Sequence, residues 1–156
     1  MRRIDVNTMT KQMGTGVYWT ELKATPQAVR VARSHVADIL TAWAVQEDVI
    51  DTARLLTSEL ATNAVVHGET GTITLEVRCF GCCLGVEVRD DSLSVPVLRS
   101  VADDTERGRG LLLVAELAES WGYYFAAGCK HVWFHLHIAD PSELPVADAV
   151  GSVDTR

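Results

Sequence analysis

Two consecutive segments of alternating apolar and polar residues constrain the fold of this chain more than any other feature. TITLEVRC (72–79) and CLGVEVRD (83–90) carry apolar side chains at every second position, and Phe80-Gly81 lies between them. This alternation predicts two strands with one apolar face each, and the short connection with its glycine predicts that they pair as a hairpin. Other elements must therefore cover one face of the sheet.

Three helices are predicted to provide that cover. They span residues 25–43, 48–67 and 110–121, where apolar side chains recur at helical spacing. The second is expected to end at Gly68 in the left-handed conformation that favours glycine. The third follows a loop that is longer than compact domains usually contain without a functional reason.

The order of the elements predicts the fold class. Further strands are expected at 17–22, 122–126 and 130–138, so the order is strand, two helices, hairpin, long loop, helix, hairpin. This predicts an α+β fold, a two-layer α/β sandwich in which a mixed, mostly antiparallel sheet carries helices on one face.

Length, composition and charge limit the function. The 156 residues predict one domain, residues 17–138, between a mobile tail at 1–16 and a flexible tail at 139–156. No apolar run approaches the roughly 18 residues that span a bilayer, and no hydrophobic segment follows the first arginines, so we expect a cytoplasmic protein without membrane contact. The net charge of −7 argues against direct nucleic-acid binding, which needs a basic surface.

The four cysteines are Cys79, Cys82, Cys83 and Cys129. One CxxC spacing suggests zinc or redox chemistry, but a second one is missing. We therefore expect free, reduced thiols. Zinc bound by Cys82 or Cys129 with nearby histidines is the alternative.

Polar residues interrupt the expected apolar stripe of the helix at 48–67. Glu59, Asn63 and His67 recur at a spacing of four within SELATNAVVHG, so they lie on one arc of the helix. The same arc carries four apolar residues: Leu55, Leu56, Leu60 and Val66. Two neighbouring buried polar groups need a common explanation, whereas His67 has the alternative role of capping the helix C-terminus.

Asp90 is the second polar residue at an apolar position. It follows Leu84, Val86 and Val88 on one face of its strand, where the long loop begins. An isolated buried charge costs several kcal/mol, so the carboxylate needs a partner. The alternatives to a ligand are that Asp90 caps a turn or pairs with an arginine.

A glycine-rich turn precedes the third helix. In ERGRGLLLV, Gly108 and Gly110 flank Arg109, and Arg107 adds a second positive charge. Glycines at a helix start let backbone N–H groups face an anion, and the helix dipole favours negative charge there. This turn would suit the phosphates of a nucleotide.

The three features together fit a nucleotide with magnesium. Asn63 offers a neutral oxygen to a hard cation. Glu59, one turn earlier, could orient or deprotonate an attacking hydroxyl. Asp90 could accept a hydrogen bond from an exocyclic amine such as that of adenine. The helix would then carry polar residues because it forms one wall of a ligand site.

These motifs resemble those of the GHKL superfamily of ATPases and kinases, which have a histidine-kinase-like, Bergerat-type ATP-binding fold. SELATNAVVHG resembles the N-box, VRDDS the adenine-aspartate motif and GRGLLLV the second glycine box. Within the superfamily, the chain is similar to the stand-alone anti-sigma-factor serine/threonine kinases over residues 17–138.

The resemblance implies residue roles, cofactors and partners. It implies that Glu59 is catalytic and that Asn63 binds magnesium. The other residues implied to bind ATP are His67, Asp90, Arg107, Gly108, Arg109, Gly110 and Leu111. The implied cofactors are ATP and Mg²⁺, and the implied partners are a sigma factor and an antagonist protein phosphorylated on serine. A homodimer is also implied.

The sequence departs from that family after Asp90. The family has glycines where this chain has Ser92 and Ser94, in a segment (92–107) that we expect to be a lid ordered by nucleotide. A nucleotide-gated protein-binding module with little or no kinase activity is therefore the alternative function, and an adaptor without nucleotide is a third. His35 lacks the context of a phosphoacceptor and is interpreted as a surface or boundary residue.

The last predicted strand has two unlike faces. Its apolar face carries Val132, Phe134, Leu136 and Ile138, and its other face carries His131, Trp133, His135 and His137. If helices cover the apolar face, the other is either solvated or a protein-binding or dimer surface, because exposed aromatic residues are enriched at interfaces. Zinc at His135 and His137 is a remoter alternative.

Overall fold

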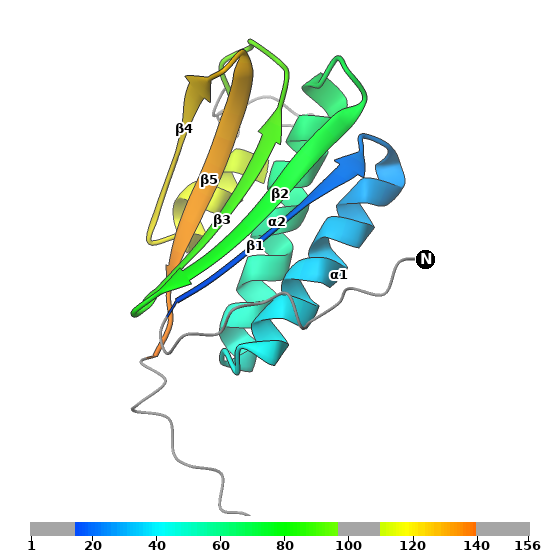
Figure 1. The fold of residues 1–156 in the computed structure, drawn as a ribbon. Helices are drawn as coiled ribbons and strands as arrows, with labels where there is room; N and C mark the ends of the chain where they lie inside the picture. The colour runs from blue at the N-terminus through cyan, green and yellow to red at the C-terminus, as the bar shows by residue number, and fades with distance from the viewer. Residues whose placement is uncertain (1–14, 97–109, 140–156) are drawn as a thin grey trace, which may run out of the picture.

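The computed structural model describes residues 15–96 and 110–139 and contains three helices and five strands in this range. They are β1 (Thr15–Lys23), α1 (Pro26–Ala42), α2 (Glu47–His67), β2 (Thr72–Phe80), β3 (Cys83–Asp90), α3 (Gly110–Leu117), β4 (Ser120–Ala126) and β5 (Cys129–His137). Figure 1 views the sheet from its open face, with the helices behind it.

The sheet has the strand order β1-β2-β3-β5-β4, and each neighbouring pair in this order is antiparallel. The predicted α+β sandwich with helices on one face is confirmed, although the described sheet is antiparallel throughout and not mixed. The predicted hairpin is β2 and β3, and Gly81 in its turn has a φ of +57°. This backbone angle favours glycine.

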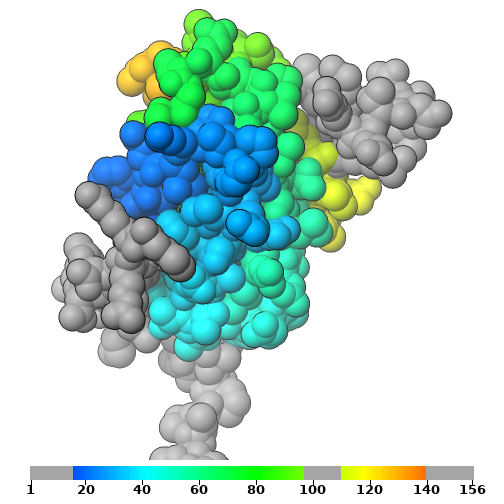
Figure 2. Space-filling view, turned by 90° about the vertical axis from the view of Figure 1, so that its right-hand side faces the viewer, coloured from blue at the N-terminus to red at the C-terminus, as the bar shows by residue number. Residues whose placement is uncertain are grey.

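The core lies between the sheet and the helices. Every second residue of β2, β3 and β5 is buried, as the alternation predicts, except the partly buried Cys79 of β2, and α1 and α2 contribute most of the opposing surface. Phe134 at the centre of β5 is fully buried, and burial of one such side chain stabilises a fold by about 1.5–3 kcal/mol. This packing fixes the ends of β3 and β5 beneath α2. Figure 2 views the helical layer from the side of α1, with α3 in yellow beside α2.

Two local predictions were wrong. The third helix ends at Leu117 and not at residue 121, and Trp121 belongs to β4. Pairing with β5 ends the helix, because Glu119 already donates its backbone N–H to the carbonyl oxygen of His135. Gly68 is extended (φ −69°, ψ 148°), not left-handed. Glycine is needed there because a Cβ atom would lie 2.7 Å from the carbonyl oxygen of Ala64.

The apolar stripe of α2 is also displaced from the predicted arc. Leu56 and Leu60 are buried, whereas Leu55 and Val66 are 42% and 57% exposed. Glu59 therefore lies on the flank of the buried stripe and not at its centre. In the described part of the chain, no helix is both long and apolar enough to cross a membrane.

Candidate functional site

The polar residues of α2 form a line along one flank of the helix. Glu59 and Asn63 are half-buried, and His67 at the end of α2 is exposed. By helix geometry, the line from Glu59 to His67 is about 12 Å long. The two ends of the line meet different elements, α3 at one end and the end of β3 at the other.

Glu59 lies against the first residue of α3. A Cβ atom on Gly110 would overlap Oε2 of Glu59, so a larger residue there would require the Glu59 side chain to move. Burial raises the pKa of the Glu59 carboxyl above its ordinary value. The N-terminus of a helix favours negative charge, which suits a carboxylate at this position.

Asn63 carries a buried acceptor without a partner. Its Oδ1 atom is inaccessible to solvent and accepts no hydrogen bond from any residue that the structure describes. A buried polar atom that makes no hydrogen bond costs about 1–3 kcal/mol, and such atoms in folded proteins usually have an explanation. A ligand or a hydrated cation that binds this oxygen would provide one.

The other end of the line meets Asp90 and Asp91. A Cβ atom on Gly68 would lie 3.6 Å from the Cβ atom of Asp90, so the chain just after α2 touches the end of β3. Oδ1 of Asp91 accepts the backbone N–H of Glu69 at 2.7 Å and joins the two segments. This bond is the largest cause that lowers the pKa of Asp91.

Asp90 is buried, as its strand parity predicts, with an exposed fraction of 2%. Its Oδ1 atom accepts the backbone N–H of Ser92 at 2.7 Å. Its Oδ2 atom lies 3.3 Å from Nζ of Lys130, but the geometry is not that of a hydrogen bond, so Oδ2 has no hydrogen-bond partner among the described residues. Burial raises the pKa of Asp90, against the opposing effects of Ser92 and Lys130.

Sequence reasoning missed Lys130. It named an arginine as a possible partner of Asp90, whereas the structure has this lysine directly opposite Asp90 in the β3–β5 pairing. A signal existed, because Lys130 has the same parity as Val132 and Phe134 and therefore belongs to the buried face of β5.

The remaining predicted residues are divided between the described and undescribed parts of the chain. Leu111 is buried in the core, so only its backbone is available to a ligand. Arg107, Gly108 and Arg109 lie outside the described residues, as does most of the predicted lid at 92–107. The structure thus brings Glu59 to Gly110 and the end of α2 to Asp90, with Asn63 between these contacts.

This arrangement suits a nucleotide with a divalent cation. Asn63 offers an unpaired oxygen to the cation, Gly110 leaves the start of α3 free of a side chain, and Asp90 offers an unpaired acceptor at the far end. Neutral and anionic oxygens are the ligands that Mg²⁺ prefers. The residues that the structure describes therefore fit both groups that the resemblance implies.

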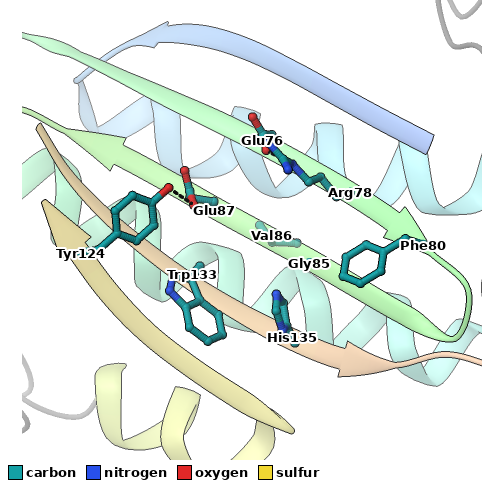
Figure 3. Close-up of a pocket in the computed structure, with 9 residues that line it drawn as sticks. All are labelled: Glu76, Arg78, Phe80, Gly85, Val86, Glu87, Tyr124, Trp133 and His135. Carbon is teal, nitrogen blue, oxygen red and sulfur yellow. Dashed lines mark hydrogen bonds and ion pairs between the residues drawn. The ribbon is translucent and has the colours of Figure 1, made fainter. Parts of the chain in front are cut away.

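A separate hollow lies on the opposite face of the sheet. It encloses about 270 Å³ between β2, β3, β4 and β5, and its lining includes Glu76, Phe80, Glu87 and Trp133 (Figure 3). The helices and the α2 line lie on the other side of the sheet, so this hollow is not the site described above.

The cysteines and histidines do not assemble a metal site in the described ranges. The four cysteines are free thiols. Cys82, Cys83, His135 and His137 border one shallow depression, but no group of three or more His, Cys, Asp or Glu side chains in residues 15–96 and 110–139 is arranged to hold a metal ion.

Comparison with known proteins gives a family and a fold. Residues 22–136 match the histidine kinase-like ATPase domain family. The fold is similar to a crystal structure of the RsbU and RsbW domains of Rv1364c from Mycobacterium tuberculosis, with a TM-score of 0.57 and 17% sequence identity. The match covers 78% of this chain and 32% of that one, so this chain spans about a third of its length. No curated protein matches the sequence.

Proposed function

We propose that this chain, which belongs to the histidine kinase-like ATPase domain family, is an ATP-binding regulator of the anti-sigma-factor serine kinase type. Membership of an ATPase domain family implies nucleotide binding. The observation that carries the proposal further is the line of Glu59, Asn63 and His67, with an unpaired buried oxygen at its centre. In this role the protein would bind a sigma factor and phosphorylate a serine of an antagonist protein.

Each residue of the candidate site would have its own role. Asp90 would accept a hydrogen bond from the amine of adenine, and Asn63 would hold Mg²⁺, which supplies positive charge to the phosphates. The start of α3 at Gly110 would face the phosphates with backbone N–H groups. Glu59 would orient the serine hydroxyl and take its proton, while positioning and charge neutralisation supply most of the catalysis of phosphoryl transfer.

The proposal is tested in two steps. The full chain is first used to capture proteins with and without ATP and magnesium, and a captured antagonist is then incubated with γ-labelled ATP. Label on a serine of the antagonist supports the kinase, and nucleotide-dependent capture without any label favours the alternative, a nucleotide-gated binding module.

One structural feature favours this alternative. Ser92 is buried, and its Oγ atom accepts the backbone N–H of Ser94. This bond ties down a segment where the family has flexible glycines.

Replacing Asn63 by alanine should weaken magnesium-dependent nucleotide binding at least tenfold, because the cation loses an oxygen ligand. Calorimetric titration with ATP in magnesium and in EDTA measures this, and the affinity in EDTA should change little. Thr57→Val is the matched control, since Thr57 is also on α2 and its buried hydroxyl is also unpaired among the described residues, but it points about 160° away from Glu59 around the helix. Equal affinities of Asn63→Ala and the control in magnesium would refute the role of Asn63.

We also propose that the open face of the sheet binds a partner protein or a second copy of the chain. One cross-strand row runs over Trp19, Glu76, Glu87, Trp133 and Gly122. Trp133 is half-buried because its indole ring lies over Gly122, where a Cβ atom would be 2.8 Å from the ring. Trp19, at the other end of the row, is 66% exposed.

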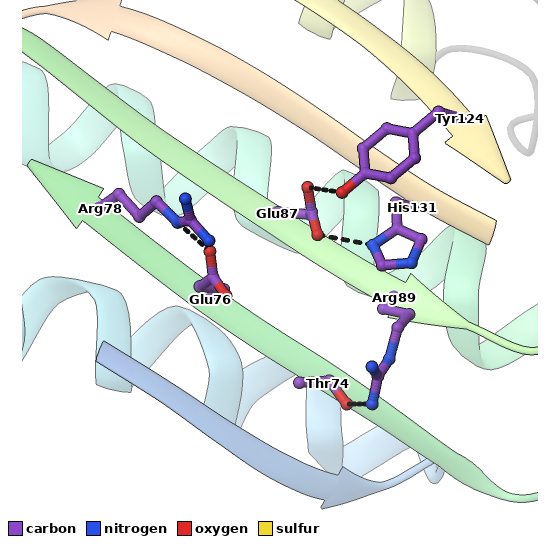
Figure 4. A network of polar contacts seen from close by, with 7 residues as sticks. All are labelled: Thr74, Glu76, Arg78, Glu87, Arg89, Tyr124 and His131. Atoms are coloured by element: carbon purple, nitrogen blue, oxygen red, sulfur yellow. Dashed lines mark hydrogen bonds and ion pairs between the residues drawn. The ribbon is translucent and has the colours of Figure 1, made fainter. Parts of the chain in front are cut away.

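A polar network lies between the two tryptophans and next to them. Glu87 accepts one hydrogen bond from the hydroxyl of Tyr124 and contacts His131. Arg78 pairs with Glu76, and Arg89 donates to Thr74 (Figure 4). Aromatic residues are enriched at binding surfaces, which also carry hydrogen-bonding polar groups. The alternative is that this face of the sheet is exposed to solvent and that these contacts only stabilise it.

Trp133→Ala should weaken association with the partner or second subunit by about 2 kcal/mol or more, as loss of a central aromatic residue does. Sedimentation or light scattering measures self-association, and the capture experiment measures the partner. ATP affinity should persist, because this face lies across the sheet from the site. Leu55→Ala, which removes an exposed apolar residue from α2 on the helical side, is the control. Unchanged mass and capture of the Trp133 variant would show that the face is merely exposed.

A further inference from the structure

A buried ion pair lies at the base-binding end of the proposed site. Lys130 of β5 is paired directly with Asp90 of β3 in the antiparallel register, and both side chains are 1% exposed. Nζ lies 3.3 Å from Oδ2. Lysine is rarely so deeply buried unless it is paired, and a hydrophobic pair of similar volume would often be no less stable here. A contribution to folding stability therefore does not by itself explain this ion pair.

The environment of Asp90 opposes its negative charge. Burial is the largest effect that raises the pKa of its carboxyl, and the neighbouring carboxylate of Asp91 acts in the same direction. The backbone N–H of Ser92 and the ammonium of Lys130 oppose this. The chain after α2 brings the exposed Glu69 near Asp91, and the exposed His67 immediately precedes Gly68. Among the groups that the structure describes here, Lys130 is the buried positive charge in contact with Asp90.

The geometry of the pair leaves one buried acceptor without a hydrogen bond. Oδ1 of Asp90 is used by the N–H of Ser92, whereas Oδ2 makes no hydrogen bond of ordinary geometry within the described residues despite its ionic contact. Lys130 thus supplies a neutralising charge through this contact and leaves at least one lone pair of Oδ2 without a donor. A protonated Oδ2 atom would carry an O–H group and would be a much weaker acceptor for the amine of a base than a carboxylate oxygen.

From this arrangement we propose that Lys130 is a positioning residue of the nucleotide site, which keeps Asp90 ionised and leaves its Oδ2 atom free to accept the exocyclic amine of the base. The inference rests on the proposed nucleotide function. Lys130 thereby helps to select a base that carries an amine. The ionisation of Asp90 on β3 depends on this lysine of β5.

The test is Lys130→Met in the full chain, with Lys23→Met, an exposed lysine of β1, as the control. Without Lys130, the pKa of the buried Asp90 carboxyl should rise further because its counter-ion is lost, so ATP affinity should fall about tenfold at pH 7. Asp90 accepts the amine of the base best when it is ionised. Raising the pH should therefore ionise Asp90 in the variant and restore its affinity for ATP. The control and the unaltered protein should keep an affinity that does not rise over the same pH range.

Two further measurements separate a positioning role from a structural one. Carbon-13 NMR of the Asp90 carboxyl in nucleotide-free protein should show a higher titration midpoint in Lys130→Met than in the control. The unaltered protein should also prefer ATP over purine riboside triphosphate, which lacks the amine, and Lys130→Met should lose this preference at pH 7. Thermal unfolding verifies that the variant is folded, and Lys130→Gln replaces it if it is not.

The outcomes distinguish this inference from the function on which it rests. If the unaltered protein does not bind ATP, the proposed function fails, whereas the NMR titration still reports whether Lys130 keeps Asp90 ionised. If the unaltered protein binds ATP but the folded variant has the same pH profile, carboxyl titration and preference for the amine, Lys130 is only structural and the inference is overturned.

Discussion

The Glu59→Ala variant is expected to bind ATP almost normally but to transfer phosphate about 10²–10⁴-fold more slowly, the usual loss when a general base is removed. The half-buried carboxylate faces the start of α3, and burial raises its pKa toward the pH at which a base works best. Transfer from γ-labelled ATP to the antagonist measures the rate, and calorimetry measures the affinity. The rate of the unaltered protein should rise with pH as Glu59 loses its proton.

Glu59→Gln is the matched variant, because it preserves the shape that packs against Gly110 but cannot accept the proton. It should be nearly as slow as Glu59→Ala. Rapid transfer by the glutamine variant would mean that Glu59 only orients the hydroxyl. If Glu59→Ala instead lost ATP affinity as severely as Asn63→Ala, its role would be structural, and the catalytic assignment would have to be abandoned.

Periodicity predicted the fold because the sheet and helices bury only one side each. The alternation in 72–79 and 83–90 determines which side chains face the core, and the structure has the predicted hairpin and helices in that order. The helix end at Leu117 was not predictable in this way. The apolar residues after it suit either a helix or a strand, and backbone pairing between Glu119 and His135 decides for the strand.

The displaced stripe of α2 has a tertiary cause. Leu55 and Leu56 have the same character in the sequence, but only Leu56 is buried. Which of the two faces the core depends on how α2 is rotated against the sheet and the other helices, and periodicity leaves that rotation uncertain by about one residue. The predicted left-handed Gly68 failed for a related reason, because contact with the carbonyl of Ala64 and not the backbone angle requires glycine.

The candidate site was predictable where one element carries several polar residues. Glu59 and Asn63 are one turn apart, so helix geometry alone groups them. The pairing of Asp90 with Lys130 joins residues 40 positions apart, and it requires the strand order β3-β5, which the sequence does not specify. Of the glycine-rich turn, only Gly110 and Leu111 are described, so the roles of Arg107, Gly108 and Arg109 stay predictions.

Asp90→Asn is expected to lower ATP affinity by roughly ten- to hundredfold, because the base loses a hydrogen bond to a charged group, typically worth about 1.5–3 kcal/mol. Calorimetric titration of the variant with ATP and magnesium measures the loss. Asp91→Asn is the matched control, since Asp91 is the adjacent aspartate and its Oδ1 atom holds the backbone of Glu69. Its affinity should stay within about a factor of three of the unaltered protein, a change of under 1 kcal/mol.

The Asp90–Lys130 pair requires that affinity and stability be measured separately. Asparagine at position 90 leaves the buried charge of Lys130 unpaired, which typically costs about 3–5 kcal/mol of folding free energy. The double variant Asp90→Asn with Lys130→Met removes both charges and should recover most of this stability, yet it should remain as weak in ATP binding as Asp90→Asn. If the double variant recovered affinity along with stability, the loss in Asp90→Asn would reflect unfolding alone, and Asp90 would not contact the base.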